Sequence, residues 1–123
     1  MILATAELEE KFTRELLARL PGSIRIGAHD FRVVPVRGNA ATSANLRGEF
    51  SSQCQEIRIK ADMPTRYEAV EVLMHEISHG MWFVGDIEDD PEEEHAVAMF
   101  GQVMMGLFRD NPWLLEWIKS AKL

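Results

Sequence analysis

Two histidines, His75 and His79, stand four residues apart and enclose Glu76 in the segment His-Glu-Ile-Ser-His. Residues at this spacing lie one turn apart on the same face of a helix, so both imidazoles can reach one metal ion. Zn²⁺ binds imidazole nitrogen at about 2.0–2.1 Å, and a helix presents two such donors without a further ordering cost. Glu76 is offset by about 100° around the helix, where its carboxylate can take a proton from metal-activated water. The segment therefore predicts a zinc site in which Glu76 is the general base.

A catalytic zinc site needs a third protein ligand, with the fourth position left for water. The extended pattern with a third histidine is absent, because Gly85 stands six residues after His79. The remaining candidates lie together at the start of the next expected helix: Glu92, Glu93, Glu94 and His95. A helix antiparallel to the first, joined to it by a short loop, brings its first turn back near His79. Acidic residues in a first turn also stabilise the helix dipole, so the spacing alone leaves the third ligand open.

Hydrophobic periodicity gives the helices that must hold these residues. Four helices are expected. The first carries Leu8, Phe12, Leu16 and Leu20 and ends at Pro21-Gly22. The second spans residues 64–83, with Thr65 and Glu68 at capping-box spacing, the third spans residues 91–109, and a short fourth helix follows Asn111-Pro112. On the third helix we expect these apolar residues to face inward: Val97, Phe100, Met104 and Leu107. On the last helix we expect Trp113 and Trp117 to cover the core, whereas an exposed pair would mark a partner site.

The stretch between the first two helices predicts three or four short strands. Residues 23–36 are predicted to form a hairpin, with Pro35 at an edge or at a strand end. Residues 37–47 lack periodicity and predict a loop, and two further strands are expected at 48–50 and 55–60. In the second of these, Ile57 and Ile59 share one face. One helix, a small mixed or antiparallel sheet and three more helices predict an α+β fold in a single domain spanning residues 1–123.

Composition and charge exclude several classes of protein. The chain has 123 residues, enough for one domain, and 20 acidic against 13 basic residues give a net charge of −7. This balance argues against a nucleic-acid-binding module and against docking on anionic lipid. The single cysteine, Cys54, excludes an internal disulfide and a cysteine-based zinc cluster. Apolar runs are shorter than the ~18 residues of a membrane span and the first residues lack a basic signal-peptide region, so we expect a cytoplasmic protein.

Three segments carry a resemblance to a known family: Met74-His75-Glu76-Ile77-Ser78-His79-Gly80, Glu94 six residues before Phe100-Gly101, and the ending Leu107-Phe108-Arg109-Asp110-Asn111-Pro112. They resemble the gluzincin type of zincin metallopeptidase, and more closely the small prophage-associated ImmA/IrrE-type metallopeptidases. The resemblance covers about residues 48–118 and implies a minimal zincin-like fold. It also implies a cytoplasmic enzyme, bacterial or phage-encoded, that cuts one regulatory protein such as a phage repressor.

The same resemblance implies roles for individual residues. The family's third ligand is a glutamate six residues before an aromatic residue or leucine and a small residue, which places it at Glu94, ahead of Glu93 and then His95. The family usually has Asn or Asp four residues past this ligand to support a histidine, whereas this chain has Ala98, and losing such support costs roughly 10–100-fold in metal affinity or activity. In zincins the strand before the active-site helix is the sheet edge, so an extended peptide substrate is expected to pair along Gln55–Lys60.

Two functions fit these residues. The first is a zinc-dependent metallopeptidase that hydrolyses a bond in a specific protein, since a pure binding module has no need of Glu76. The alternative is a zincin-like module, catalytically weak or inactive, that acts by docking a protein partner, which Ala98 favours. A closed structural zinc site is disfavoured, because Glu94 and His95 are adjacent on one helix and their side chains diverge by about 100°.

Overall fold

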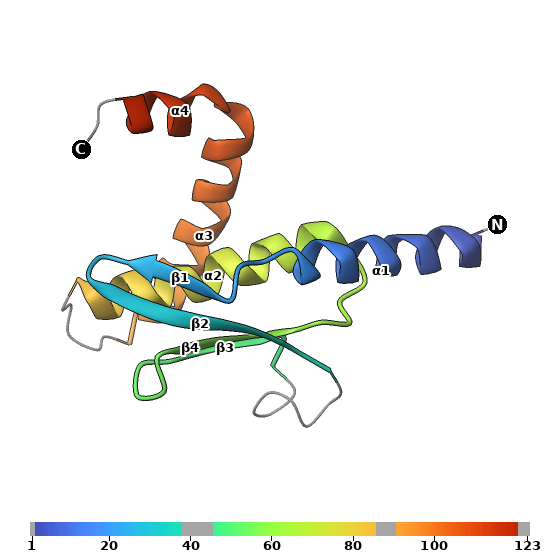
Figure 1. Ribbon diagram of the computed structural model, residues 1–123, viewed down its shortest axis with the longest axis horizontal. Coiled ribbons are helices and arrows are strands. Elements are labelled where there is room, and N and C mark those ends of the chain that lie inside the picture. Colours follow the sequence, from blue (N-terminus) through green and yellow to red (C-terminus); the bar gives the residue numbers. More distant parts are fainter. Residues whose placement is uncertain (1, 38–45, 86–90, 121–123) are drawn as a thin grey trace.

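The computed structural model describes residues 2–37, 46–85 and 91–120, which form four helices and a four-stranded sheet (Figure 1). In chain order the elements are α1 (Ile2–Ala18), β1 (Ser23–Ile26), β2 (His29–Val36), β3 (Gly48–Ser51), β4 (Glu56–Lys60), α2 (Arg66–Val84), α3 (Glu93–Asp110) and α4 (Trp113–Ser120). The predicted α+β fold class is confirmed, and the helices expected at 64–83 and 91–109 agree with α2 and α3 to within two residues. Most of the loop expected at 37–47 lies outside the described residues. None of the described helices is both long enough and apolar enough to cross a bilayer.

The sheet is mixed, with the strand order β1-β2-β4-β3. β1 and β2 form the predicted hairpin, in which Ile26 pairs with His29. Gly27 turns the chain between them at φ +61°, a left-handed conformation that glycine adopts without steric strain. β2 and β4 run parallel, and β3 pairs antiparallel with β4. The chain therefore goes out to the edge of the sheet as β3 and returns to its centre as β4.

The expectation that Gln55–Lys60 forms the sheet edge is wrong. β4, which holds all but the first of these residues, pairs with β2 on one side and with β3 on the other, so β3 is an edge strand. Ile57 and Ile59 are fully buried, in keeping with a central strand. Alternation along a strand shows which face is buried, but it carries no information about which strands lie on either side.

The core lies between one face of the sheet and helix α2. Its buried side chains come from four parts of the chain: Leu17, Ile57, Ile59, Met63, Ala69 and Val72. α2 begins as predicted, because the Thr65 side chain accepts a hydrogen bond of 3.1 Å from the backbone N–H of Glu68. α1 lies beside the start of α2, where the Arg66 guanidinium donates two hydrogen bonds to the Glu9 carboxylate. Helix α2 is thus packed against the sheet and also joined to α1.

α3 packs against α2 through its first half and then projects away from the sheet toward α4 (Figure 1). Val97 is fully buried as expected. The expected inward orientation of Phe100 and Leu107 is wrong, since their exposed fractions are 51% and 44%. The expectation that Trp113 and Trp117 cover the core is also wrong, because both are more than half exposed. The periodicity marks an apolar face correctly, but α3 leaves the core before most of that face can be covered.

Candidate metal centre

The two histidines lie one turn apart on the face of α2 that meets the start of α3. Their ring centroids are 5.0 Å apart, and the His75 and His79 side chains are 26% and 17% exposed. The backbones of the two helices come close at Gly101, where an added Cβ would lie 3.1 Å from the backbone nitrogen of His75. This close crossing brings the first turn of α3 within reach of both imidazole rings.

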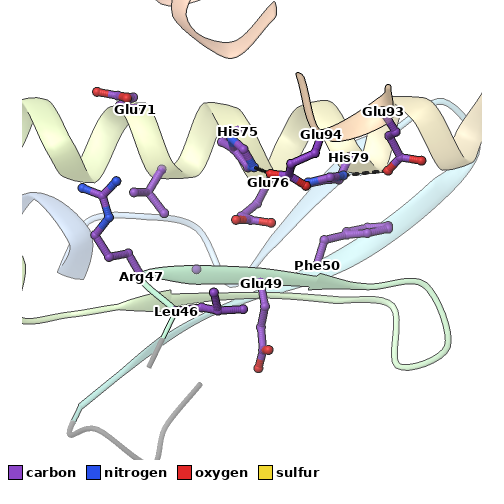
Figure 2. Close-up of a pocket in the computed structure, with 12 residues that line it drawn as sticks. Leu46, Arg47, Glu49, Phe50, Glu71, His75, Glu76, His79, Glu93 and Glu94 are labelled. Atoms are coloured by element: carbon purple, nitrogen blue, oxygen red, sulfur yellow. Dashed lines mark hydrogen bonds and ion pairs between the residues drawn. The ribbon is translucent and has the colours of Figure 1, made fainter. Parts of the chain in front are cut away.

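Glu94 joins the two histidines, as Figure 2 shows. Its Oε1 lies 2.7 Å from Nε2 of His75, and its Oε2 lies 3.1 Å from Nε2 of His79. The three side chains each offer one ligand atom, and these atoms all lie within 4.8 Å of one another. Tetrahedral zinc with bonds of 2.0–2.1 Å needs ligand atoms about 3.3 Å apart. The two contacts of Glu94 use different oxygens, so three atoms within 4.8 Å of one another draw closer by up to about 1.5 Å to surround such an ion. Two imidazole nitrogens and a carboxylate oxygen are donors that zinc binds, and the set therefore fits zinc.

The other candidates for third ligand lie elsewhere. Glu93 contacts the opposite side of the His79 ring, with its Oε2 2.8 Å from Nδ1. Glu92 precedes α3 as its N-cap, and the side chains of Glu92 and His95 are exposed. Among the described residues, the cluster with metal-ligand geometry is His75, His79 and Glu94. The structure therefore brings together the three residues that the sequence and the resemblance indicated, and it places Glu93 at the other ring nitrogen of His79, outside the ligand cluster.

Glu76 is a buried carboxyl beside this cluster. It is 6% exposed, and burial raises its pKa to about 7 because the charged form loses its contact with water. An electrostatic interaction with His79 lowers the pKa of Glu76, while interactions with Glu94 and Glu49 raise it. The side chain points from α2 toward β3 and away from the His75 and His79 rings (Figure 2). Glu76 thus stands where it can exchange a proton with a molecule in the site without occupying a ligand position.

A pocket of about 600 Å³ opens between α2, β3 and the start of α3. Its walls are formed by Leu46, Arg47, Gly48, Glu49, Phe50, Glu71, Val72, His75, Glu76, His79, Glu93 and Glu94. Gly48 allows β3 to approach α2, because an added Cβ would lie 2.6 Å from Cγ1 of Val72 and 3.2 Å from Cγ of Glu76. The sequence did not predict this wall. Its only local signal was a glycine opening a short strand, and nothing in the sequence placed that strand opposite Glu76.

The outer edge of β3 carries backbone groups directed away from the sheet. The N–H of Lys60 donates to the C=O of Arg47 at 2.8 Å, which makes these two residues a hydrogen-bonded pair. Bonded and non-bonded pairs alternate in an antiparallel ladder. The N–H and C=O of Gly48 therefore point away from β4, and those of Phe50, two residues further, do the same. Both residues line the pocket, so this edge borders the candidate metal centre.

Comparisons with protein-family models, with curated proteins and with solved structures found no significant match to this chain.

Proposed function

We propose that this protein is a zinc-dependent peptidase that hydrolyses a peptide bond in a specific protein. His75, His79 and Glu94 would hold the metal, and Glu76 would act as the general base. The observation that carries the proposal is the convergence in one pocket of a buried carboxyl and a His-His-Glu cluster whose ligand atoms lie within 4.8 Å of one another. When bound there, zinc supplies Lewis-acid chemistry, which polarises a carbonyl group and makes water acidic enough to lose a proton near neutral pH.

The chain's own contribution to the reaction is proton transfer at Glu76. Its carboxylate accepts the proton of the attacking water and then delivers it to the nitrogen of the leaving amine. A carboxyl whose pKa is raised toward neutrality by burial suits both halves of this exchange. The same burial keeps bulk water away from the transferring proton.

The edge of β3 provides the binding surface for an extended peptide, in place of the Gln55–Lys60 strand expected from the sequence. The outward N–H and C=O groups of Gly48 and Phe50 have the spacing that an added antiparallel strand requires. Such pairing recognises any extended backbone, and side-chain contacts in the pocket then select the sequence. A substrate held there lies against the face of α2 that carries Glu76.

A second candidate function is a binding module that docks a partner in the same pocket without cutting it. Ala98, one turn after Glu94, is the observation in its favour, because it has no polar group with which to support a metal-binding histidine. In either case we propose, from the family resemblance alone, a regulatory protein of phage or host as the partner.

The first test is the zinc content of protein purified without a histidine tag, measured by elemental mass spectrometry. We expect about one zinc per chain in the unmodified protein and in Glu76→Gln, and none in His79→Ala. A metal-free protein after supplementation with zinc would contradict the metal centre itself.

The second test separates the two functions. Purified protein is incubated with a library of peptides from a bacterial proteome, and new termini are identified by mass spectrometry. We expect cleavage by the unmodified protein and by Glu10→Gln, a control that removes the same charge from the exposed face of α1. Glu76→Gln should keep its zinc and lose cleavage. Cleavage at an unchanged rate by Glu76→Gln would refute the general-base role, whereas zinc binding without any cleavage would favour the binding module.

A further inference from the structure

We infer that Glu93 is a positioning residue that orients His79 toward the metal, an inference that rests on the proposed zinc centre. The two adjacent acids of α3 contact different atoms. Glu94 approaches Nε2 of both histidines, whereas Oε2 of Glu93 lies 2.8 Å from Nδ1 of His79. Figure 2 shows the two carboxylates on opposite sides of the His79 ring. Neighbouring residues on a helix diverge by about 100°, which allows the first turn of α3 to hold this ring from both sides.

The contact with Nδ1 suits the form of histidine that a metal requires. A histidine that gives the lone pair of Nε2 to a metal keeps a hydrogen on Nδ1, and this N–H can then donate to a carboxylate. Glu93 is placed to accept that hydrogen bond. A carboxylate acceptor at Nδ1 fixes the rotation of the His79 ring about its Cβ–Cγ bond and raises the basicity of Nε2.

Burial makes the contact between Glu93 and His79 stronger than the contacts of Glu94. The Glu93 side chain is 23% exposed and that of His79 is 17% exposed, whereas Glu94 is 71% exposed. Water therefore competes less for the Glu93 carboxylate, and a hydrogen bond to a charged group that is sheltered from water is among the stronger ones. The more open Glu94 can adjust its position to an incoming ion.

Among the described residues, no other polar contact takes the place of the one between Glu93 and Nδ1 of His79. In the part of the chain that the structure describes, the carboxylates in contact with His79 are Glu93 at Nδ1 and Glu94 at Nε2. Ala98, where the resembling family usually has a supporting Asn or Asp, offers only a methyl group. Glu93, five residues earlier in the chain, is thus the described residue that can supply the orientation.

The test compares zinc affinity in three variants by competition with a chromophoric chelator at 150 mM salt. We expect Glu93→Ala to weaken zinc binding about 10–100-fold while keeping one zinc per chain. Glu93→Gln should recover much of this loss, because its amide oxygen still accepts a hydrogen bond from Nδ1. Glu92→Ala removes a charge from the neighbouring, exposed position, and we expect its affinity to stay within about threefold of the unmodified protein.

Cobalt spectra and proton exchange report on the centre without using activity. With Co²⁺ in place of zinc, Glu93→Ala should keep the visible spectrum of the unmodified protein, whereas Glu94→Ala, which loses a ligand, should change it. In the zinc-loaded protein the Nδ1 hydrogen of His79 should be visible by NMR, and Glu93→Ala should lose this signal through faster exchange with water.

Each other outcome overturns a distinct claim. Unchanged zinc affinity and an unchanged Nδ1 signal in Glu93→Ala would overturn the positioning role and leave the zinc centre intact. A changed cobalt spectrum in Glu93→Ala together with an unchanged one in Glu94→Ala would make Glu93 the ligand instead. Absence of zinc binding by the unmodified protein would remove the proposed function and this inference together.

Discussion

Replacing the buried Glu76 carboxyl by an amide is expected to stabilise the metal-free protein at alkaline pH. The pKa of Glu76 is raised from 4.5 to about 7 in the folded state, chiefly by burial. One pKa unit corresponds to about 1.4 kcal/mol, so keeping Glu76 ionised costs the folded state about 3 kcal/mol at pH 8. Glu76→Gln has almost the same shape and removes this cost, so its free energy of unfolding should rise by about that amount.

The pH dependence follows from which state holds the proton more tightly. Between pH 4.5 and 7 the folded protein keeps the Glu76 proton and the unfolded chain releases it, so the stability of the unmodified protein falls as pH rises through this window. Below the window both states are protonated and the cost disappears. The stabilisation by Glu76→Gln should therefore be under about 1 kcal/mol at pH 5 and about 3 kcal/mol at pH 8.

Urea unfolding followed by circular dichroism in the presence of EDTA measures this difference at both pH values. Glu10→Gln, on the exposed face of α1, is the matched control and should change stability by less than about 0.5 kcal/mol. Zinc should reduce the gain in Glu76→Gln at pH 8, because a nearby cation favours the ionised carboxylate. A gain of equal size at pH 5 and pH 8, or no gain at pH 8 without metal, would refute the account of Glu76.

Three substitutions test the packing that supports the site. Gly101→Ala places a Cβ 3.1 Å from the backbone nitrogen of His75, so we expect α3 to shift, stability to fall by about 1–3 kcal/mol in urea unfolding, and zinc affinity to fall with it. Gly106→Ala, on the same helix, places a Cβ whose nearest neighbour beyond the adjacent residues and the helix's own backbone is Nη2 of Arg109 at 4.0 Å, so it should instead stabilise by up to about 1 kcal/mol; a loss of stability equal to that of Gly101→Ala would contradict the steric explanation. Thr65→Ala removes the hydrogen bond to the Glu68 N–H at the start of α2 and should cost about 1 kcal/mol, measured in the same way, and an unchanged midpoint would show that this cap is dispensable.

The sequence by itself determined the features that depend on near neighbours in the chain. A spacing of four residues puts His75 and His79 on one face wherever the helix lies, because the helical repeat is a local property. The cap at Thr65 and the hairpin of β1 and β2 follow from short-range patterns in the same way, and all are present in the structure. The choice of Glu94 over Glu93 came from a family resemblance, since position within one helical turn left both open.

Only the tertiary structure decided the features that depend on distant parts of the chain. β3 and not the Gln55–Lys60 strand forms the edge beside the site, because strand order is set by long-range pairing that alternation does not encode. Phe100 and Trp113 are exposed because α3 leaves the core after crossing α2, although the apolar face of the helix was evident from the sequence. The separate contacts of Glu93 and Glu94 likewise require the crossing at Gly101, which fixes how the first turn of α3 meets the His79 ring.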